Sequence, residues 1–75
     1  MSDQKKSLFP SNAARLERLP SVLDRTGLSR STIYKKISEG TFPQPVKLGE
    51  RAVAWDAAAV TAWIGERVAA NDPVV

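Results

Sequence analysis

The sequence predicts a small, mainly α-helical domain that carries one β-hairpin. Three observations predict this class. The chain has 75 residues, which is room for one small core. Apolar residues recur at helical spacing in three capped segments, and two short alternating runs flank Gly49. We therefore expect a flexible N-terminal arm over residues 1–14, one domain over residues 15–70 and a C-terminal tail over residues 71–75.

The first helix is expected from Pro20 to about Thr26. Proline suits the first position of a helix because its missing N–H costs nothing there. Gly27 ends the segment. Apolar spacing predicts one buried side, made of Leu19, Val22, Leu23 and Thr26. Residues 15–19 fit either a short strand or an extra turn of helix, and the sequence leaves both open.

The second helix is expected over residues 30–39, with Ser29 as its N-cap and Gly40 just beyond its end. Ile33 and Ile37 share one face and are expected in the core. The opposite face is polar and partly basic, with Ser31, Thr32, Lys35 and Ser38. A turn that feeds a capped helix of this kind is how a helix-turn-helix delivers a recognition helix to the DNA major groove. The residues therefore predict a DNA-binding protein.

The hairpin is expected from two short strands, residues 46–48 and 52–55, with Phe42 in the core before them. Alternation predicts one apolar face that closes over the helices, made of Val46, Leu48, Val53 and Trp55. The tip would project Arg51 and Lys47.

The last helix is expected over residues 57–70, with Asp56 as its N-cap. Its helical spacing predicts a core stripe of Val60, Trp63, Ile64 and Val68. The two tryptophans are interpreted as core residues rather than as platforms for stacked bases.

Charge and composition narrow the function. The net charge is +3, and six basic residues against two acidic ones lie between Arg25 and Arg51. This bias suits a polyanion, and Arg25 is one candidate phosphate contact. The chain has no Cys and no His, which excludes disulfides, zinc fingers and imidazole bases. We expect no enzyme, catalytic residue, cofactor, metal or small-molecule ligand, no membrane partner, and a cytoplasmic location.

Three pieces of the chain resemble the AlpA-type regulators and excisionases of phages and mobile elements, small winged helix-turn-helix proteins related to the MerR DNA-binding domain. The pieces are residues 19–34, residues 42–55 with Phe42-Pro43-Gln44-Pro45-Val46-Lys47-Leu48-Gly49, and the amphipathic end around Trp63. Together they cover residues 16–68. The resemblance implies that the second helix enters the major groove and that the hairpin wing reaches the neighbouring backbone or minor groove.

Carried over by position, the resemblance implies double-stranded DNA contacts from Ser29, Arg30, Ser31, Thr32, Tyr34, Lys35, Lys47 and Arg51. It implies an excisionase (recombination directionality factor), a regulator of integrase or excision genes, or both. Partners would be an integrase or recombinase and adjacent copies of the chain on DNA, at the nucleoid. Two alternatives remain open: a small protein-interaction module, and the DNA-recognition domain of a phage packaging protein (terminase small subunit).

Overall fold

A computed structural model of the chain describes residues 14–71. The expected arm and tail lie almost entirely outside this part of the chain. The described elements run in the order β1 (Leu16–Glu17), α2 (Leu19–Thr26), α3 (Arg30–Glu39), β2 (Val46–Lys47), β3 (Val53–Asp56) and α4 (Ala57–Ala70). Three helices with one small antiparallel sheet confirm the predicted fold class, a mainly α winged helix-turn-helix.

The helix boundaries follow the predicted caps. Gly27 and Gly40 end α2 and α3 in the left-handed conformation, with φ of 75° and 78°, a region that favours glycine. The Ser29 hydroxyl accepts a 3.2 Å hydrogen bond from the Thr32 amide at the start of α3. At the start of α4, the Asp56 carboxylate accepts a 3.0 Å bond from the Ala58 amide. These caps satisfy amides that have no partner inside their helices.

The sheet has the strand order β1-β3-β2 and is antiparallel throughout. Residues 16–17 are therefore a strand, which decides between the two structures that the sequence left open. Glu17 pairs with Trp55 of β3, and the Arg15 carbonyl accepts a 2.9 Å bond from the Ala57 amide. The N-terminal end of the domain is thus joined to the central strand.

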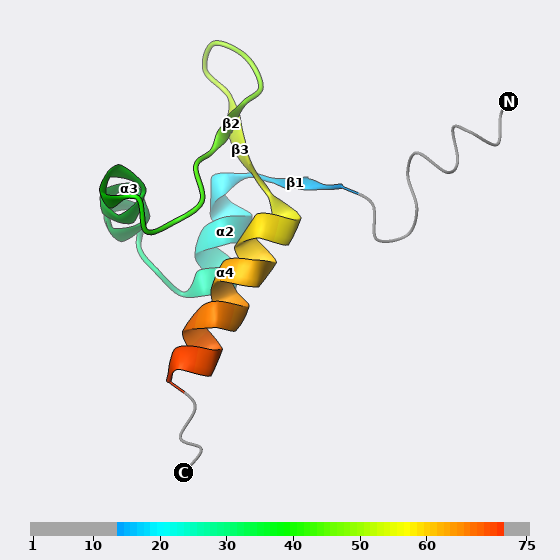
Figure 1. Cartoon of the computed structure of the whole chain (residues 1–75). Helices are drawn as coiled ribbons and strands as arrows, with labels where there is room; N and C mark the ends of the chain where they lie inside the picture. Colours follow the sequence, from blue (N-terminus) through cyan, green and yellow to red (C-terminus); the bar gives the residue numbers. More distant parts are fainter. Residues whose placement is uncertain (1–13, 72–75) are drawn as a thin grey trace, which may run out of the picture.

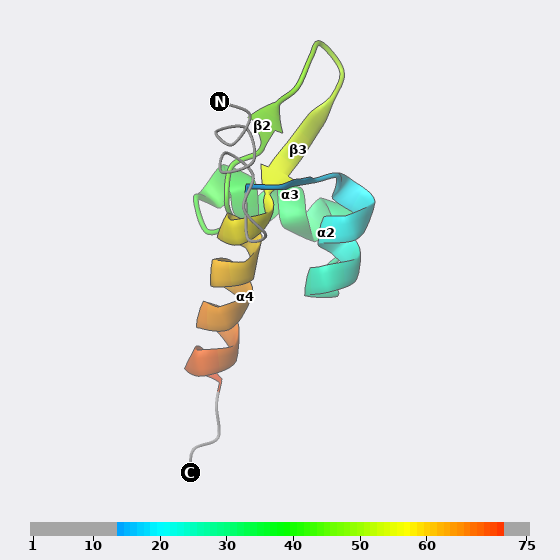
Figure 2. The ribbon, with the colours of Figure 1, turned by 90° about the vertical axis from the view of Figure 1, so that its right-hand side faces the viewer.

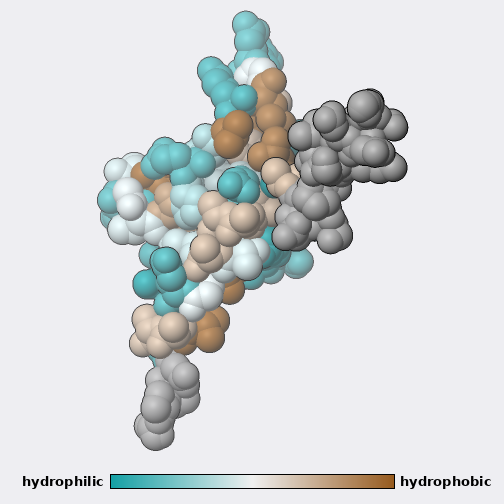
Figure 3. Space-filling view, turned by 45° about the vertical axis from the view of Figure 1, so that its right-hand side comes forward, coloured by the Kyte–Doolittle hydropathy of each residue, from teal (hydrophilic) through white to brown (hydrophobic). Residues whose placement is uncertain are grey.

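The predicted single apolar face of the hairpin is wrong. Val46 pairs with Ala54, and Lys47 pairs with Val53. Successive residues of a strand point to opposite faces, so Val46 lies on the face opposite Trp55. Val46 and Leu48 are accordingly exposed, by 42% and 48%. Figure 3 shows the apolar surface that the hairpin presents as a result.

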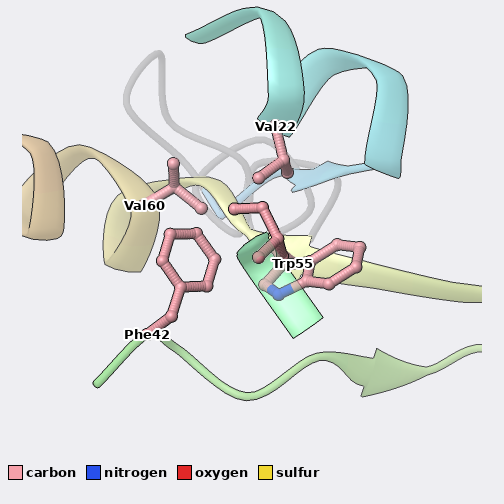
Figure 4. Close-up of a cluster of buried hydrophobic side chains, with 5 residues drawn as sticks. Val22, Phe42, Trp55 and Val60 are labelled. Atoms are coloured by element: carbon pink, nitrogen blue, oxygen red, sulfur yellow. The ribbon is translucent and has the colours of Figure 1, made fainter. Parts of the chain in front are cut away.

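The core lies where α2, α3, α4 and the base of β3 meet. Its buried members are Val22, Ile33, Phe42, Trp55 and Val60 (Figure 4). Leu19, Leu23, Ile37, Trp63 and Ile64 pack against this cluster and are partly buried, as the helical spacing predicts.

Val68 was expected in the core stripe of α4 but is 64% exposed. The last turns of α4 run past the core, away from the other elements (Figures 1 and 2). Helical spacing predicts which face of a helix is apolar, but it does not predict how far along the helix the other elements cover that face. The hairpin projects from the opposite end of the molecule, with α3 beside its base (Figures 1 and 2).

Candidate nucleic-acid interface

The N-cap and the first two turns of α3 present hydroxyl and basic side chains to solvent. Ser29, Arg30, Ser31 and Lys35 are exposed, and Thr32 is half-buried. The Ser29 hydroxyl donates a 2.9 Å hydrogen bond to the Thr32 hydroxyl as well as capping the helix. The helix terminus therefore has a fixed local hydrogen-bond arrangement, and its positive dipole end faces the same side.

Arg30 and Tyr34 form a stack on the flank of α3. The guanidinium carbon of Arg30 lies 5.9 Å from the centre of the Tyr34 ring, a cation–π distance. The Tyr34 ring in turn meets the buried Trp55 edge to face, with centroids 6.3 Å apart. Arg30 is thus supported by an aromatic ring that rests on the core.

Lys35 lies one turn further along α3, and its ammonium group is 3.9 Å from the Glu39 carboxylate. Both side chains are at least half exposed. An exposed pair at this helical spacing contributes about 0.3–0.5 kcal/mol, so it leaves Lys35 free to exchange Glu39 for another anion.

The wing supplies Lys47 and Arg51, and both are exposed. The register places Lys47 beside Val53, on the face of the sheet that also carries Trp55. At the tip, the Ala52 carbonyl accepts hydrogen bonds from the Leu48 and Gly49 amides, at 2.7 and 3.2 Å. These bonds close the hairpin next to Arg51.

The connector between α3 and the wing is held by two indole N–H groups. The Trp55 indole donates to the Pro43 carbonyl at 3.1 Å, and the Trp63 indole donates to the Thr41 carbonyl at 2.8 Å. Phe42 lies between these carbonyls and packs edge to face on Trp63, with centroids 4.9 Å apart. Both tryptophans therefore have packing and hydrogen-bonding roles in the fold, in keeping with their interpretation as core residues.

A cleft of about 250 Å³ separates the wing from α2 and α3. It brings together Arg30, Tyr34 and Arg51, three of the predicted site residues. It also contains Arg18, which the sequence reasoning missed. Arg18 precedes α2, and its Nε donates a 3.0 Å hydrogen bond to the Val53 carbonyl of the wing. Its only signal in the sequence is its positive charge, within residues 15–19, whose structure the sequence leaves undecided.

The remaining predicted residues do not line this cleft. They are Ser29, Ser31, Thr32, Lys35 and Lys47. Ser29 is the N-cap of α3, Ser31, Thr32 and Lys35 lie within α3, and Lys47 belongs to the wing strand.

Arg25, a candidate phosphate contact, has a structural role instead. Its guanidinium donates to both carboxylate oxygens of Glu17 at 2.8 Å, and it also bonds the Thr61 hydroxyl. Glu17 is only 8% exposed. Arg25 therefore neutralises a buried carboxylate and ties α2 to β1 and α4.

A larger hollow, of about 600 Å³, lies between the connector and α4. It is lined by the acidic Glu66 as well as by the basic Arg67 and Lys36, whereas the charged residues around the smaller cleft are all basic.

Within residues 14–71, no group of three or more His, Asp, Glu or Cys side chains is arranged to hold a metal ion. In the same part of the chain, no helix has the length and apolar character needed to cross a membrane.

Comparison with known proteins shows which family the chain resembles. The family model described as Prophage CP4-57 regulatory protein (AlpA) matches residues 15–68. The uncharacterized protein ORF88 of Enterobacteria phage P4 is 51% identical over 55 residues, which are 73% of this chain and 62% of that protein. The chain thus spans less than two thirds of the length of ORF88. The DNA-binding transcriptional activator AlpA of Escherichia coli (strain K12) is 36% identical over 62 residues, which are 75% of this chain and 89% of AlpA.

Proposed function

The chain belongs to the AlpA family of prophage regulatory proteins, and from this premise we propose that it binds duplex DNA as a sequence-specific regulator without catalysing a reaction. In this proposal α3 lies in the major groove, with Arg30, Ser31 and Lys35 toward base edges and phosphates. The wing follows the neighbouring backbone through Lys47 and Arg51.

One observation carries the proposal. Basic side chains from α3, from the wing and from the residue before α2 face the same cleft, and its described lining contains no acidic residue. Of the acids on the neighbouring elements, Glu17 pairs with Arg25 and Asp56 caps α4, while Glu50 is exposed at the wing tip and lines a separate hollow with Lys47. A surface of one sign, built on a capped helix, suits a polyanion better than it suits a docking face for another protein.

The relative in Escherichia coli is named a transcriptional activator, which favours a role at promoters. An excisionase would use the same surface at clustered sites beside an attachment site, together with an integrase. A module of this size contacts few base pairs, so adjacent copies or a second protein would raise its occupancy. A regulator and an excisionase would thus bind different patterns of sites on DNA, and one experiment distinguishes the two patterns.

The experiment is selection of bound fragments from the host genome at about 150 mM salt, where non-specific phosphate contacts are weak. Enrichment of a promoter site would support a regulator, and a cluster of sites beside an integrase attachment site would support an excisionase. Folded protein that enriches no fragment would overturn DNA binding and leave the protein-interaction module.

Two variants give the selection a control. Lys35→Gln removes one positive charge from the α3 face, and Arg15→Gln removes one from an exposed residue directly before β1, a strand that lies apart from α3 in Figure 1. We expect Lys35→Gln to lower fragment recovery and Arg15→Gln to leave it near the wild-type level. Equal losses in both variants would indicate that net charge, rather than the α3 face, determines binding.

A further inference from the structure

We propose that the cleft between α2, α3 and the wing is a binding site for one phosphate group of the DNA backbone, with Arg18, Arg30 and Arg51 as its ligands. This inference rests on the proposed function and adds to it a residue, Arg18, and a specific ligand. It also assigns the site a mechanical role, because one phosphate held there would join the wing to the recognition helix.

Arg18 is held in place by the fold. Its Nε donates to the Val53 carbonyl at 3.0 Å, across 35 residues of sequence. An arginine side chain has five N–H donors, so this bond leaves four for another acceptor. The same bond attaches the wing strand to the start of α2, and it fixes the guanidinium at the edge of the cleft.

Arg30 is also held before any ligand arrives. Its stack on Tyr34, at 5.9 Å, and the contact of Tyr34 with Trp55 fix its direction. Arg51 approaches the cleft from the tip of the wing. The three arginines thus come from three different parts of the chain, and two of them contact the fold, Arg18 through the Val53 carbonyl and Arg30 through the Tyr34 ring.

The charge in the cleft is uncompensated within the described residues. In this part of the chain the ion pairs are Arg25 with Glu17 and Lys35 with Glu39. Neither pair involves the three arginines of the cleft. Like charges that line one hollow repel each other, and an anion between them removes the repulsion.

A phosphate fits this arrangement better than a carboxylate does. Guanidinium groups bind phosphate through paired N–H donors, and a phosphodiester offers oxygens to more than one of them. The cleft is also open to solvent between the wing and α3, so it admits a group that is part of a long backbone. Its occupant would contact α3 through Arg30 and the wing through Arg51 at once.

The first test uses inorganic phosphate and the full chain without DNA. Thermal unfolding is measured in phosphate and in chloride at matched ionic strength. Phosphate at about three times its Kd should raise the Tm of the wild type by roughly 3–6 °C. Arg18→Gln should lose this shift, whereas Arg15→Gln, with the same change of charge, should keep it. Equal shifts in the two variants would overturn the site.

Arg18→Gln also removes the hydrogen bond to Val53, so a second variant is needed that changes the site without changing the fold. Arg51→Gln meets this need, because within the described residues the Arg51 side chain makes no hydrogen bond or ion pair. It should also lose the phosphate shift while its Tm in chloride stays near that of the wild type. A full phosphate shift in Arg51→Gln would contradict a shared site.

The second test separates failure of the site from failure of the proposed function. Affinity for a duplex of about 20 base pairs is measured over a range of salt concentrations. Arg18→Gln should lower the magnitude of the log–log slope by about 0.9, the value for one neutralised phosphate, and Arg15→Gln should not change it. If the wild type binds duplex with a steep slope that Arg18→Gln leaves unchanged, the site is wrong and DNA binding stands. If the wild type does not bind duplex at all, the proposed function fails, and this inference fails with it.

Discussion

Replacing Arg25 by glutamine should lower the stability of the domain without removing a DNA contact. The guanidinium bonds both oxygens of Glu17 at 2.8 Å, and the side chains of Arg25 and Glu17 are 29% and 8% exposed. Removing one partner of a fully buried pair costs about 3–5 kcal/mol, because a charge is left without compensation. Water reaches the exposed edge of Arg25, so we expect a smaller cost than for a fully buried pair, about 2–3 kcal/mol.

That loss is large for a chain of this size. A core this small supplies only about 3–5 kcal/mol of net stability, and each kcal/mol moves Tm by about 4–8 °C. Arg25→Gln should therefore lower Tm by about 8–24 °C. The Arg25→Met/Glu17→Met double variant should recover a large part of the loss, because it removes both charges. The assay is far-ultraviolet circular dichroism against temperature, with Arg15→Gln, the same change at an exposed residue before β1, as the matched variant.

An unchanged Tm in Arg25→Gln would refute the structural role of this arginine. So would a double variant that is less stable than either single variant. A third result would contradict the assignment in another way: a folded Arg25→Gln protein whose salt slope on DNA falls by about 0.9, as expected of a phosphate contact.

Three further outcomes are expected. Ile33→Ala should lower the free energy of unfolding by about 2–5 kcal/mol, since Ile33 is fully buried. Its urea titration should show little folded protein, and a midpoint equal to that of the wild type would contradict the place of Ile33 in the core. Ser29→Ala should cost about 1 kcal/mol through loss of the α3 cap, whereas Ser29→Asp should keep the cap and Tm but weaken duplex binding, because it adds a negative charge to the proposed interface. Leu48→Ser should change Tm by less than about 4 °C, because Leu48 is 48% exposed; a larger fall would restore the hairpin face that the register excludes.

The helices could be predicted from the sequence because their signals are local. Ser29 and Asp56 accept hydrogen bonds from nearby amides, Gly40 donates to carbonyls of the preceding turn, and the apolar spacing of Ile33 and Val60 repeats within single helices. The hairpin face could not be predicted in this way. It depends on which residue of β2 lies opposite Ala54, and a shift of one residue exchanges the two faces.

The arginines illustrate the same limit for the site. Arg18 directly precedes α2 and Arg25 lies in its last turn, and the sequence does not show which of the two has an acidic partner. The fold separates them because Glu17 of β1 reaches Arg25, while the Val53 carbonyl reaches Arg18. These partners lie 8 and 35 residues away, so only the pairing of β1 and β3 determines which arginine is left to face the cleft.

The core and the interface share one residue, and this sharing fixes the geometry of the site. Trp55 is fully buried, yet its ring supports Tyr34 and thereby Arg30, and its indole N–H holds the connector at Pro43. It also belongs to β3, the strand from which the wing extends. A displacement of Trp55 would therefore move α3 and the wing together. The proposed interface would contact DNA through both elements and so needs a constant distance between them, and a buried tryptophan that touches α3 and belongs to β3 provides it in the free protein.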